Sequence, residues 1–267
     1  HFYENAGTLG AHERRGQGYS NYLLGRYEAT LDVLRAEMHN AENVLPILIT
    51  ECGSLQNGRQ AADNWLRVLA WNAFLTKTMQ RPDQIELFVP FVFLHMPWNP
   101  ISGDAVFTPK DNRQQHLTID DFEATPIANF FELWRDFNGR RLPVAYDKEW
   151  LDVVAIHSNK KISLAVTNMG GRQLLLDLSS IQQQYPEVSA RQTRLNYHEG
   201  DLTFQPNQPV EINAIPVDVN ETTVIHLVPK KKIQPTQGVH QNRYYARKTV
   251  VKSTGKPILF KITTPQG

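Results

Sequence analysis

Residues 44–54 read Val-Leu-Pro-Ile-Leu-Ile-Thr-Glu-Cys-Gly-Ser, an apolar run that ends in a glutamate and a glycine-containing turn. An uninterrupted apolar run is what a strand buried on both faces of a parallel sheet needs. A longer amphipathic segment follows over 59–79, with apolar residues such as Leu66, Leu69 and Ala73 at helical spacing. This stretch therefore predicts one βα unit.

Similar units flank it on both sides. Residues 1–3 read as the tip of a strand, and apolar residues recur at helical spacing over 19–39. A third apolar run over 85–96 leads into a long loop over 97–118 and a further helix over 125–137. Successive βα units are typical of an α/β fold built on a parallel sheet, which we predict for residues 1–142.

The pattern changes at Pro143 to short alternating runs separated by turn-forming residues. Such runs are typical of antiparallel strands, and we predict a β-sandwich over 143–229. Residues 230–267 begin with three lysines and continue with strand-like runs. We interpret them as a linker and the start of a second, truncated β-sandwich.

Composition limits the functional classes. A chain of 267 residues with 41% hydrophobic and 21% charged residues can bury a sizeable core. It contains no run of roughly 18 apolar residues, so we expect no membrane span. The lone cysteine, Cys52, cannot form an internal disulfide. Because the chain opens on His1 without a methionine, we expect it to be a fragment.

Charge is distributed unevenly. Residues 229–267 carry nine of the 28 Lys and Arg residues and no acid, which leaves 19 basic against 27 acidic residues before them. A basic tail can bind an anionic polymer, but we favour a piece of another domain. No sequence motif supports nucleic-acid binding, which therefore ranks last among the candidate functions. We find no zinc spacing or nucleotide-binding fingerprint, so we expect no metal and no cofactor.

The chemistry-bearing residues fall at the ends of the three predicted strands, where parallel α/β barrels place their active sites. Glu51 is the candidate nucleophile, since retaining glycosidases need a carboxylate to attack the anomeric carbon. Tyr3 could donate a hydrogen bond that orients this carboxylate and keeps it charged. The alternatives are that Glu51 only binds loop amides and that the Tyr3 side chain only packs against its neighbours.

Four further residues are candidates for sugar binding. Trp98 and Asn99 close the third strand, and the indole could stack on a sugar ring, although a core tryptophan is the alternative. His95 could hydrogen-bond a sugar hydroxyl or be a core histidine. Arg113 lies in the long loop, where it could contact sulfate esters or hydroxyls, or be solvated surface.

The strand ends His1-Phe2-Tyr3, Ile49-Thr50-Glu51-Cys52-Gly53-Ser54 and Trp98-Asn99 resemble the last three barrel units of glycoside hydrolase family 86, the β-agarases and β-porphyranases. The resemblance covers most of residues 1–230. It implies the C-terminal part of a (β/α)8 TIM barrel followed by β-sandwich domains, in a secreted bacterial endo-hydrolase of agarose or porphyran. It also implies that Glu51 is the nucleophile, that His1 and Tyr3 line the cleft, and that Trp98 is a sugar platform.

The chain departs from the family pattern in one respect. The family's acid/base glutamate lies on strand four, and this chain begins at strand six, so we expect it to lack general acid catalysis unless the missing half of the barrel is supplied. Two alternatives stay open: a non-catalytic polysaccharide-binding fragment, and a related barrel enzyme acting on a xylan, mannan or β-glucan. The sequence does not separate agarose from porphyran, and it does not give the oligomeric state.

Overall fold

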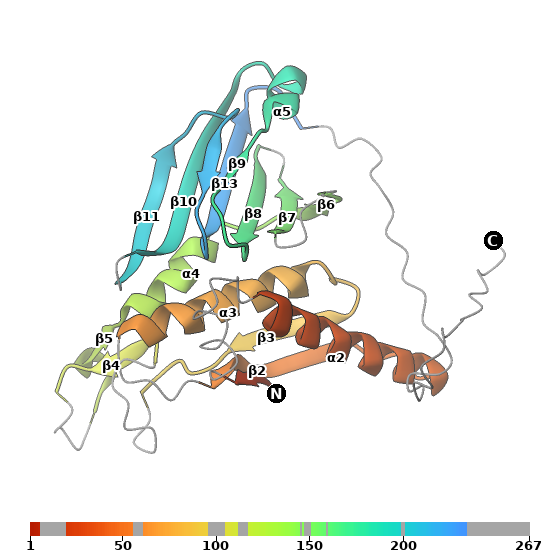
Figure 1. Ribbon diagram of the computed structural model, residues 1–267, viewed down its shortest axis with the longest axis vertical. Helices are drawn as coiled ribbons and strands as arrows, with labels where there is room; N and C mark the ends of the chain where they lie inside the picture. Colours follow the sequence, from red (N-terminus) through yellow and green to blue (C-terminus); the bar gives the residue numbers. More distant parts are fainter. Residues whose placement is uncertain are drawn as a thin grey trace.

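The computed structural model describes residues 1–5, 20–55, 61–95, 105–111, 117–144, 146, 151–158, 160–198 and 201–233. These residues form a mixed α/β structure. A small parallel sheet carries helices on one side, and a larger antiparallel sheet stands on those helices (Figure 1). The described residues form no closed barrel. The predicted linker and second sandwich, residues 234–267, lie outside the described part of the chain.

The parallel sheet has the strand order β1-β2-β3. Both pairings are parallel, and the connections run through helices. The elements are β1 (Phe2–Asn5), α2 (Ser20–Asn40), β2 (Ile47–Leu55), α3 (Ala61–Met79) and β3 (Ile85–Pro90). The βα units predicted from the apolar runs are therefore present. Strand β2 extends past the predicted end at Thr50, and β3 stops at Pro90 instead of residue 96.

Helices α2 and α3 cover one face of this sheet. Their core includes Tyr27, Phe74 and Ile49, each at most 5% exposed. Cys52 is fully buried in the same core. Side chains alternate across a strand, so the neighbours of these buried residues point the other way. Leu48, Leu87 and Val89 on that opposite face are 54%, 44% and 37% exposed.

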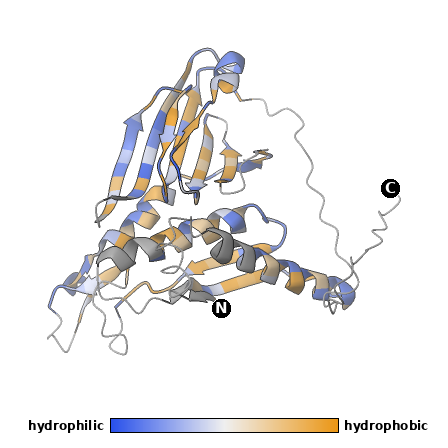
Figure 2. Cartoon of the chain, in the orientation of Figure 1, coloured by the Kyte–Doolittle hydropathy of each residue, from blue (hydrophilic) through white to orange (hydrophobic). Residues whose placement is uncertain are grey.

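The antiparallel sheet has six strands in the order β11-β10-β13-β8-β7-β6. The strands are β6 (Arg140–Leu142), β7 (Leu151–His157), β8 (Ile162–Asn168), β10 (Val188–His198), β11 (Asp201–Pro209) and β13 (Thr222–Pro229). The sheet starts at Arg140, slightly before the predicted change at Pro143. Figure 2 shows apolar residues along β2, β7 and β8, whereas β10 and β11 carry many hydrophilic ones.

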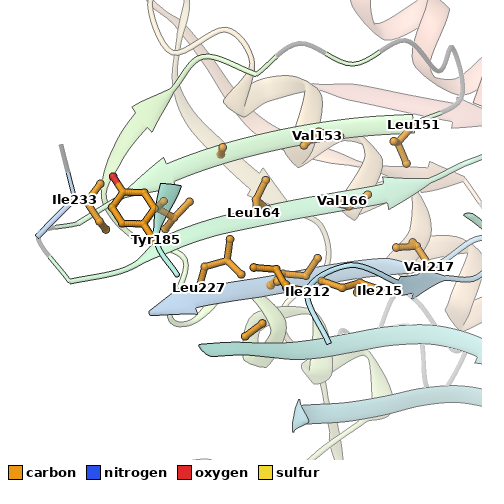
Figure 3. Packing of buried hydrophobic residues seen from close by; sticks show 14 residues of the cluster. Leu151, Val153, Leu164, Val166, Tyr185, Ile212, Ile215, Val217, Leu227 and Ile233 are labelled. Atoms are coloured by element: carbon orange, nitrogen blue, oxygen red, sulfur yellow. The ribbon is translucent and has the colours of Figure 1, made fainter. Parts of the chain in front are cut away.

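The two faces of the antiparallel sheet have different partners. One face packs against the short pair β9 (Leu174–Leu176) and β12 (Ile215–Val217) and helix α5 (Ser179–Gln184), and Figure 3 shows this core. The other face packs against α3 and α4 (Asn129–Trp134) through residues that include Trp71 and Phe130. Helix α3 is therefore buried between the two sheets.

A small lobe follows β3. It contains β4 (Phe107–Pro109), the 3-10 turns η1 (Ile119–Asp121) and η2 (Pro126–Ala128), and β5 (Phe122–Ala124), with β4 and β5 paired antiparallel. Part of the predicted long loop is thus ordered strand. The predicted helix over 125–137 is shorter than expected. Thr125 caps η2 by accepting a hydrogen bond from the Ile127 amide, and only Asn129–Trp134 is α-helical.

We expect the protein to lose stability in alkali through Tyr27. This side chain is fully buried, and its hydroxyl lies 2.6 Å from Thr78 Oγ1. Burial raises the pKa of Tyr27 above its ordinary value of 10.0, although the hydrogen bond to Thr78 acts in the opposite direction. The folded state thus keeps a proton that the unfolded state releases as the pH rises past 10.0, so stability falls above that pH.

Urea unfolding at a series of pH values measures this effect. The Tyr27→Phe variant should lose less stability than the wild type between about pH 9 and pH 12, because phenylalanine has no proton to release. Lys77 also titrates in alkali, but it is present in both proteins and its contribution cancels in the comparison. An identical pH dependence in the two proteins would refute the assignment to Tyr27.

Candidate active site

Glu51 lies in a β-bulge of β2. In the pairing with β3, Ile49 is opposite Phe88 and Cys52 is opposite Pro90, so β2 has one more residue than β3 between these positions. A bulge of this kind turns a side chain toward a new direction, and bulges are frequent beside active sites. Here Glu51 is half-buried while the next residue, Cys52, is fully buried. The sequence placed Glu51 at a strand end, and the structure places it inside the strand.

His1 meets the Glu51 carboxylate. The His1 Nδ1 atom lies 2.6 Å from Glu51 Oε2, and the two side chains are 60% and 31% exposed. Strand β1 runs parallel to β2 with Phe2 opposite Cys52, which brings His1 level with Glu51. An Nδ1–H group at this distance donates a hydrogen bond that fixes the orientation of the carboxylate. His1 was predicted to bind substrate, and the structure gives it a direct contact with the candidate nucleophile.

The structure describes only some of the other predicted site residues. Tyr3 pairs with Gly53 in the β1–β2 register, but its side chain lies outside the described part, so its bond to Glu51 stays a prediction. Trp98, Asn99 and Arg113 also lie outside the described residues. His95 is half-buried, and its backbone amide donates to the Phe107 carbonyl at 2.9 Å. Its predicted contact with sugar stays a prediction.

Sequence reasoning missed the segment that follows β3. The Phe91 amide donates to the Cys52 carbonyl at 3.0 Å, so this segment continues beside the residue that follows Glu51. Two positions further on, Phe93 is 54% exposed. The aromatic pair Phe91 and Phe93 directly after an apolar strand was the available signal. Both phenylalanines were instead included in a strand predicted to continue to residue 96.

Two further findings concern metal binding and membrane spans in the described part of the chain. Within the described ranges, no group of three or more His, Cys, Asp or Glu side chains has an arrangement that could hold a metal ion. No helix in the described part of the chain is both long and apolar enough to cross a bilayer.

The chain is similar to known galactan hydrolases. It is 23% identical to β-porphyranase A from Phocaeicola plebeius, over 98% of this chain and 37% of that protein. It is 20% identical to a β-agarase from Microbulbifer thermotolerans and 21% identical to a funoran endo-β-hydrolase from Wenyingzhuangia aestuarii, over 83% and 88% of this chain and 21% and 34% of theirs. The chain therefore spans well under half the length of these relatives. No family model matches it.

Solved structures agree in fold. A β-porphyranase of glycoside hydrolase family 86 from the human gut bacterium Bacteroides plebeius matches with a TM-score of 0.68 and 22% identity, over 93% of this chain and 43% of that one. A second family 86 structure, in complex with neoagarooctaose, matches with a TM-score of 0.65 and 19% identity, over 83% of this chain and 36% of that one. These neighbours confirm the resemblance to family 86 over most of the chain.

Proposed function

We propose that this chain is the C-terminal part of the catalytic domain of a retaining endo-glycoside hydrolase that cleaves red-algal galactans, with Glu51 as its nucleophile. The observation that carries the proposal is the bulged strand β2, which presents Glu51 beside His1 at 2.6 Å. A carboxylate on a parallel strand, turned out of the helix-covered core and paired with a hydrogen-bond donor, is arranged as a nucleophile must be. The names of the similar proteins support the substrate class.

In the proposed reaction, Glu51 attacks the anomeric carbon and forms a covalent glycosyl-enzyme. The leaving sugar takes a proton from a second carboxyl group about 5–5.5 Å away, and water then cleaves the intermediate with help from the same group. His1 holds the Glu51 carboxylate in its orientation before the attack. The second carboxyl group belongs to an upstream strand-four glutamate, as the family resemblance implies.

The exposed face of the parallel sheet supports the proposal that further barrel strands complete the site. Leu48, Leu87 and Val89 are large apolar side chains on one face of adjacent strands, and each is more than a third exposed. The interior of a (β/α)8 barrel is filled by layers of branched apolar side chains from its strands. We propose that these residues belong to that interior and that the remaining strands of the barrel cover them. The resemblance further implies secretion.

The test is hydrolysis of agarose, porphyran and funoran by the longer protein that carries the upstream barrel units. We expect oligosaccharides to be released from one or more of these polymers and not from xylan or mannan. Proton NMR in the first minutes should show the new reducing ends in the β configuration, since a retaining enzyme preserves the configuration of the bond it cleaves. Initial α products, or cleavage of xylan or mannan alone, would overturn the proposal.

A further inference from the structure

Phe93 presents an exposed aromatic ring on an ordered support. Its side chain is 54% exposed, yet it packs on two other rings. The ring centroid of Phe107 lies 5.2 Å away at an interplanar angle of 63°, and that of Phe131 lies 6.0 Å away at 85°. Phe131 in turn contacts Phe130, which is only 3% exposed. These edge contacts hold the Phe93 ring in place from the protein side.

The backbone under Phe93 is also fixed. The amides of Val106 and Phe107 donate to the carbonyls of Val92 and Phe93 at 3.2 and 3.0 Å. Val92 and Val106 are at most 4% exposed. The segment around Phe93 is therefore anchored by backbone hydrogen bonds to residues at the start of β4. A ligand that contacts this ring has little ordering entropy to overcome.

The register of β2 with β3 brings the backbone before Phe93 beside the candidate nucleophile. Pro90 is opposite Cys52 in the sheet, and Phe93 is three residues further on. Three extended residues span at most about 10 Å, so the Phe93 backbone lies no more than roughly that distance beyond the level of Cys52, the residue after Glu51. Neighbouring sugar units of one polysaccharide chain bridge such a distance. Exposed apolar patches beside a site are frequent in ligand-binding grooves.

The charges of the surrounding lobe indicate which sugar unit fits. Described residues between 105 and 137 include six acids, Asp111, Asp120, Asp121, Glu123, Glu132 and Asp136, and two bases, Lys110 and Arg135. The Lys110 ammonium donates to the Asp120 carbonyl at 2.7 Å, and Arg135 pairs with Glu132 at 2.6 Å. Among the described residues of this lobe, acidic side chains therefore outnumber basic ones, and such an excess of negative charge disfavours a sulfate ester.

We propose that Phe93 is a stacking platform for an uncharged sugar unit of the galactan chain, bound next to the unit that Glu51 attacks. The inference rests on the proposed function and adds to it a sugar-binding subsite and a preference for uncharged sugar units. The ring contacts the apolar C–H face of the sugar, while the excess of acidic side chains on the described part of the lobe disfavours units that carry sulfate. Phe93 is a binding residue in this scheme and takes no part in the chemical step.

The test is calorimetric titration of the Glu51→Gln variant of the longer protein with neoagarooctaose, which is neutral, and with a sulfated porphyran octasaccharide. Adding Phe93→Ala should weaken binding of neoagarooctaose about tenfold, and Phe93→Tyr should leave it within about threefold because the ring is kept. Ile119→Ala is the matched control, since Ile119 is apolar, 77% exposed and in the same lobe. It should change nothing.

Several results would contradict the proposed role of Phe93 as a stacking platform. Unchanged binding by a folded Phe93→Ala variant would do so, and so would an equal loss on Ile119→Ala. An equal effect of Phe93→Ala on the sulfated octasaccharide would contradict the preference, and absence of binding to either oligosaccharide would contradict the subsite. Failure of the proposed function is distinguishable, because it appears as full hydrolysis by Glu51→Gln alone.

Discussion

Replacing Glu51 with alanine should lower the rate of galactan hydrolysis by about five orders of magnitude, as is typical when an enzyme loses its nucleophile. No other described carboxylate is at ion-pair distance from His1. The variant should fold normally, because Glu51 is half-buried and its neighbours Ile49 and Cys52 supply the core contacts. Reducing-sugar release measures the rate, and thermal unfolding checks the fold.

Two controls separate a nucleophile from a merely nearby charge. Adding azide to the Glu51→Ala variant should restore turnover and give a glycosyl azide of inverted configuration, because the small anion takes the place of the carboxylate. Glu86 is an exposed carboxylate on the adjacent strand β3, and Glu86→Gln should leave the rate unchanged. A Glu51→Ala variant that keeps more than about a tenth of the rate would refute the role of Glu51.

Replacing Lys77 with methionine should destabilise the fold by about 3–5 kcal/mol, the cost of leaving a buried charge without its partner. The Lys77 ammonium lies 2.6 Å from Asp152 Oδ1 and 3.3 Å from Glu28 Oε1. It thereby links α2, α3 and β7 where the two sheets meet across the helices. Asp152 is 2% exposed, so water does not replace the lost cation.

The pKa shifts of the pair agree with this assignment. Burial raises the pKa of Asp152 above its usual value, although Lys77 acts to lower it. Burial acts to lower the pKa of Lys77, yet the carboxylates of Asp152 and Glu28 together hold it above its usual value. One ammonium thus serves two carboxylates, and Asp152 Oδ2 has no hydrogen-bond partner. Stability from Lys77 is present at neutral pH and is lost as the pH rises through its raised pKa.

Urea unfolding of the variants measures the cost of losing Lys77. Adding Asp152→Leu to Lys77→Met should recover most of the lost stability, since the unpaired carboxylate is removed. Arg135 and Glu132 form a comparable pair at 2.6 Å, but their side chains are 66% and 46% exposed. Arg135→Met should cost less than about 1 kcal/mol. Equal costs for Lys77→Met and Arg135→Met would contradict the account.

The strands that form the buried core could be predicted from sequence. The apolar run over 151–157 predicts a strand, and strand β7 (Leu151–His157) has these bounds because its residues are almost all buried. Strand β11 (Asp201–Pro209) was missed. It is an edge strand with two prolines and mostly exposed polar residues, and such a strand gives no apolar pattern. Edge strands depend on a neighbour that the local sequence does not show.

The candidate site was predictable in identity but not in geometry. The apolar run that ends at Glu51 indicates a carboxylate near the end of a strand. The bulge that turns Glu51 outward depends on how β2 pairs with β3, and local sequence does not contain that register. The burial of α3 on two sides was missed for a similar reason. Leu69 packs toward the parallel sheet and Trp71 toward the antiparallel one, and helical spacing alone does not tell which element covers each face.

The most direct measurement of the central claim is mass spectrometry of the longer protein after reaction with a 2-deoxy-2-fluoro galactoside that has a good leaving group. Such a compound forms the covalent intermediate and slows its hydrolysis, so the sugar stays on the nucleophile. The account predicts a single added sugar on the peptide that contains Glu51, and none in the Glu51→Gln variant. Labelling of another carboxylate, with the Glu51 peptide unmodified, would contradict it.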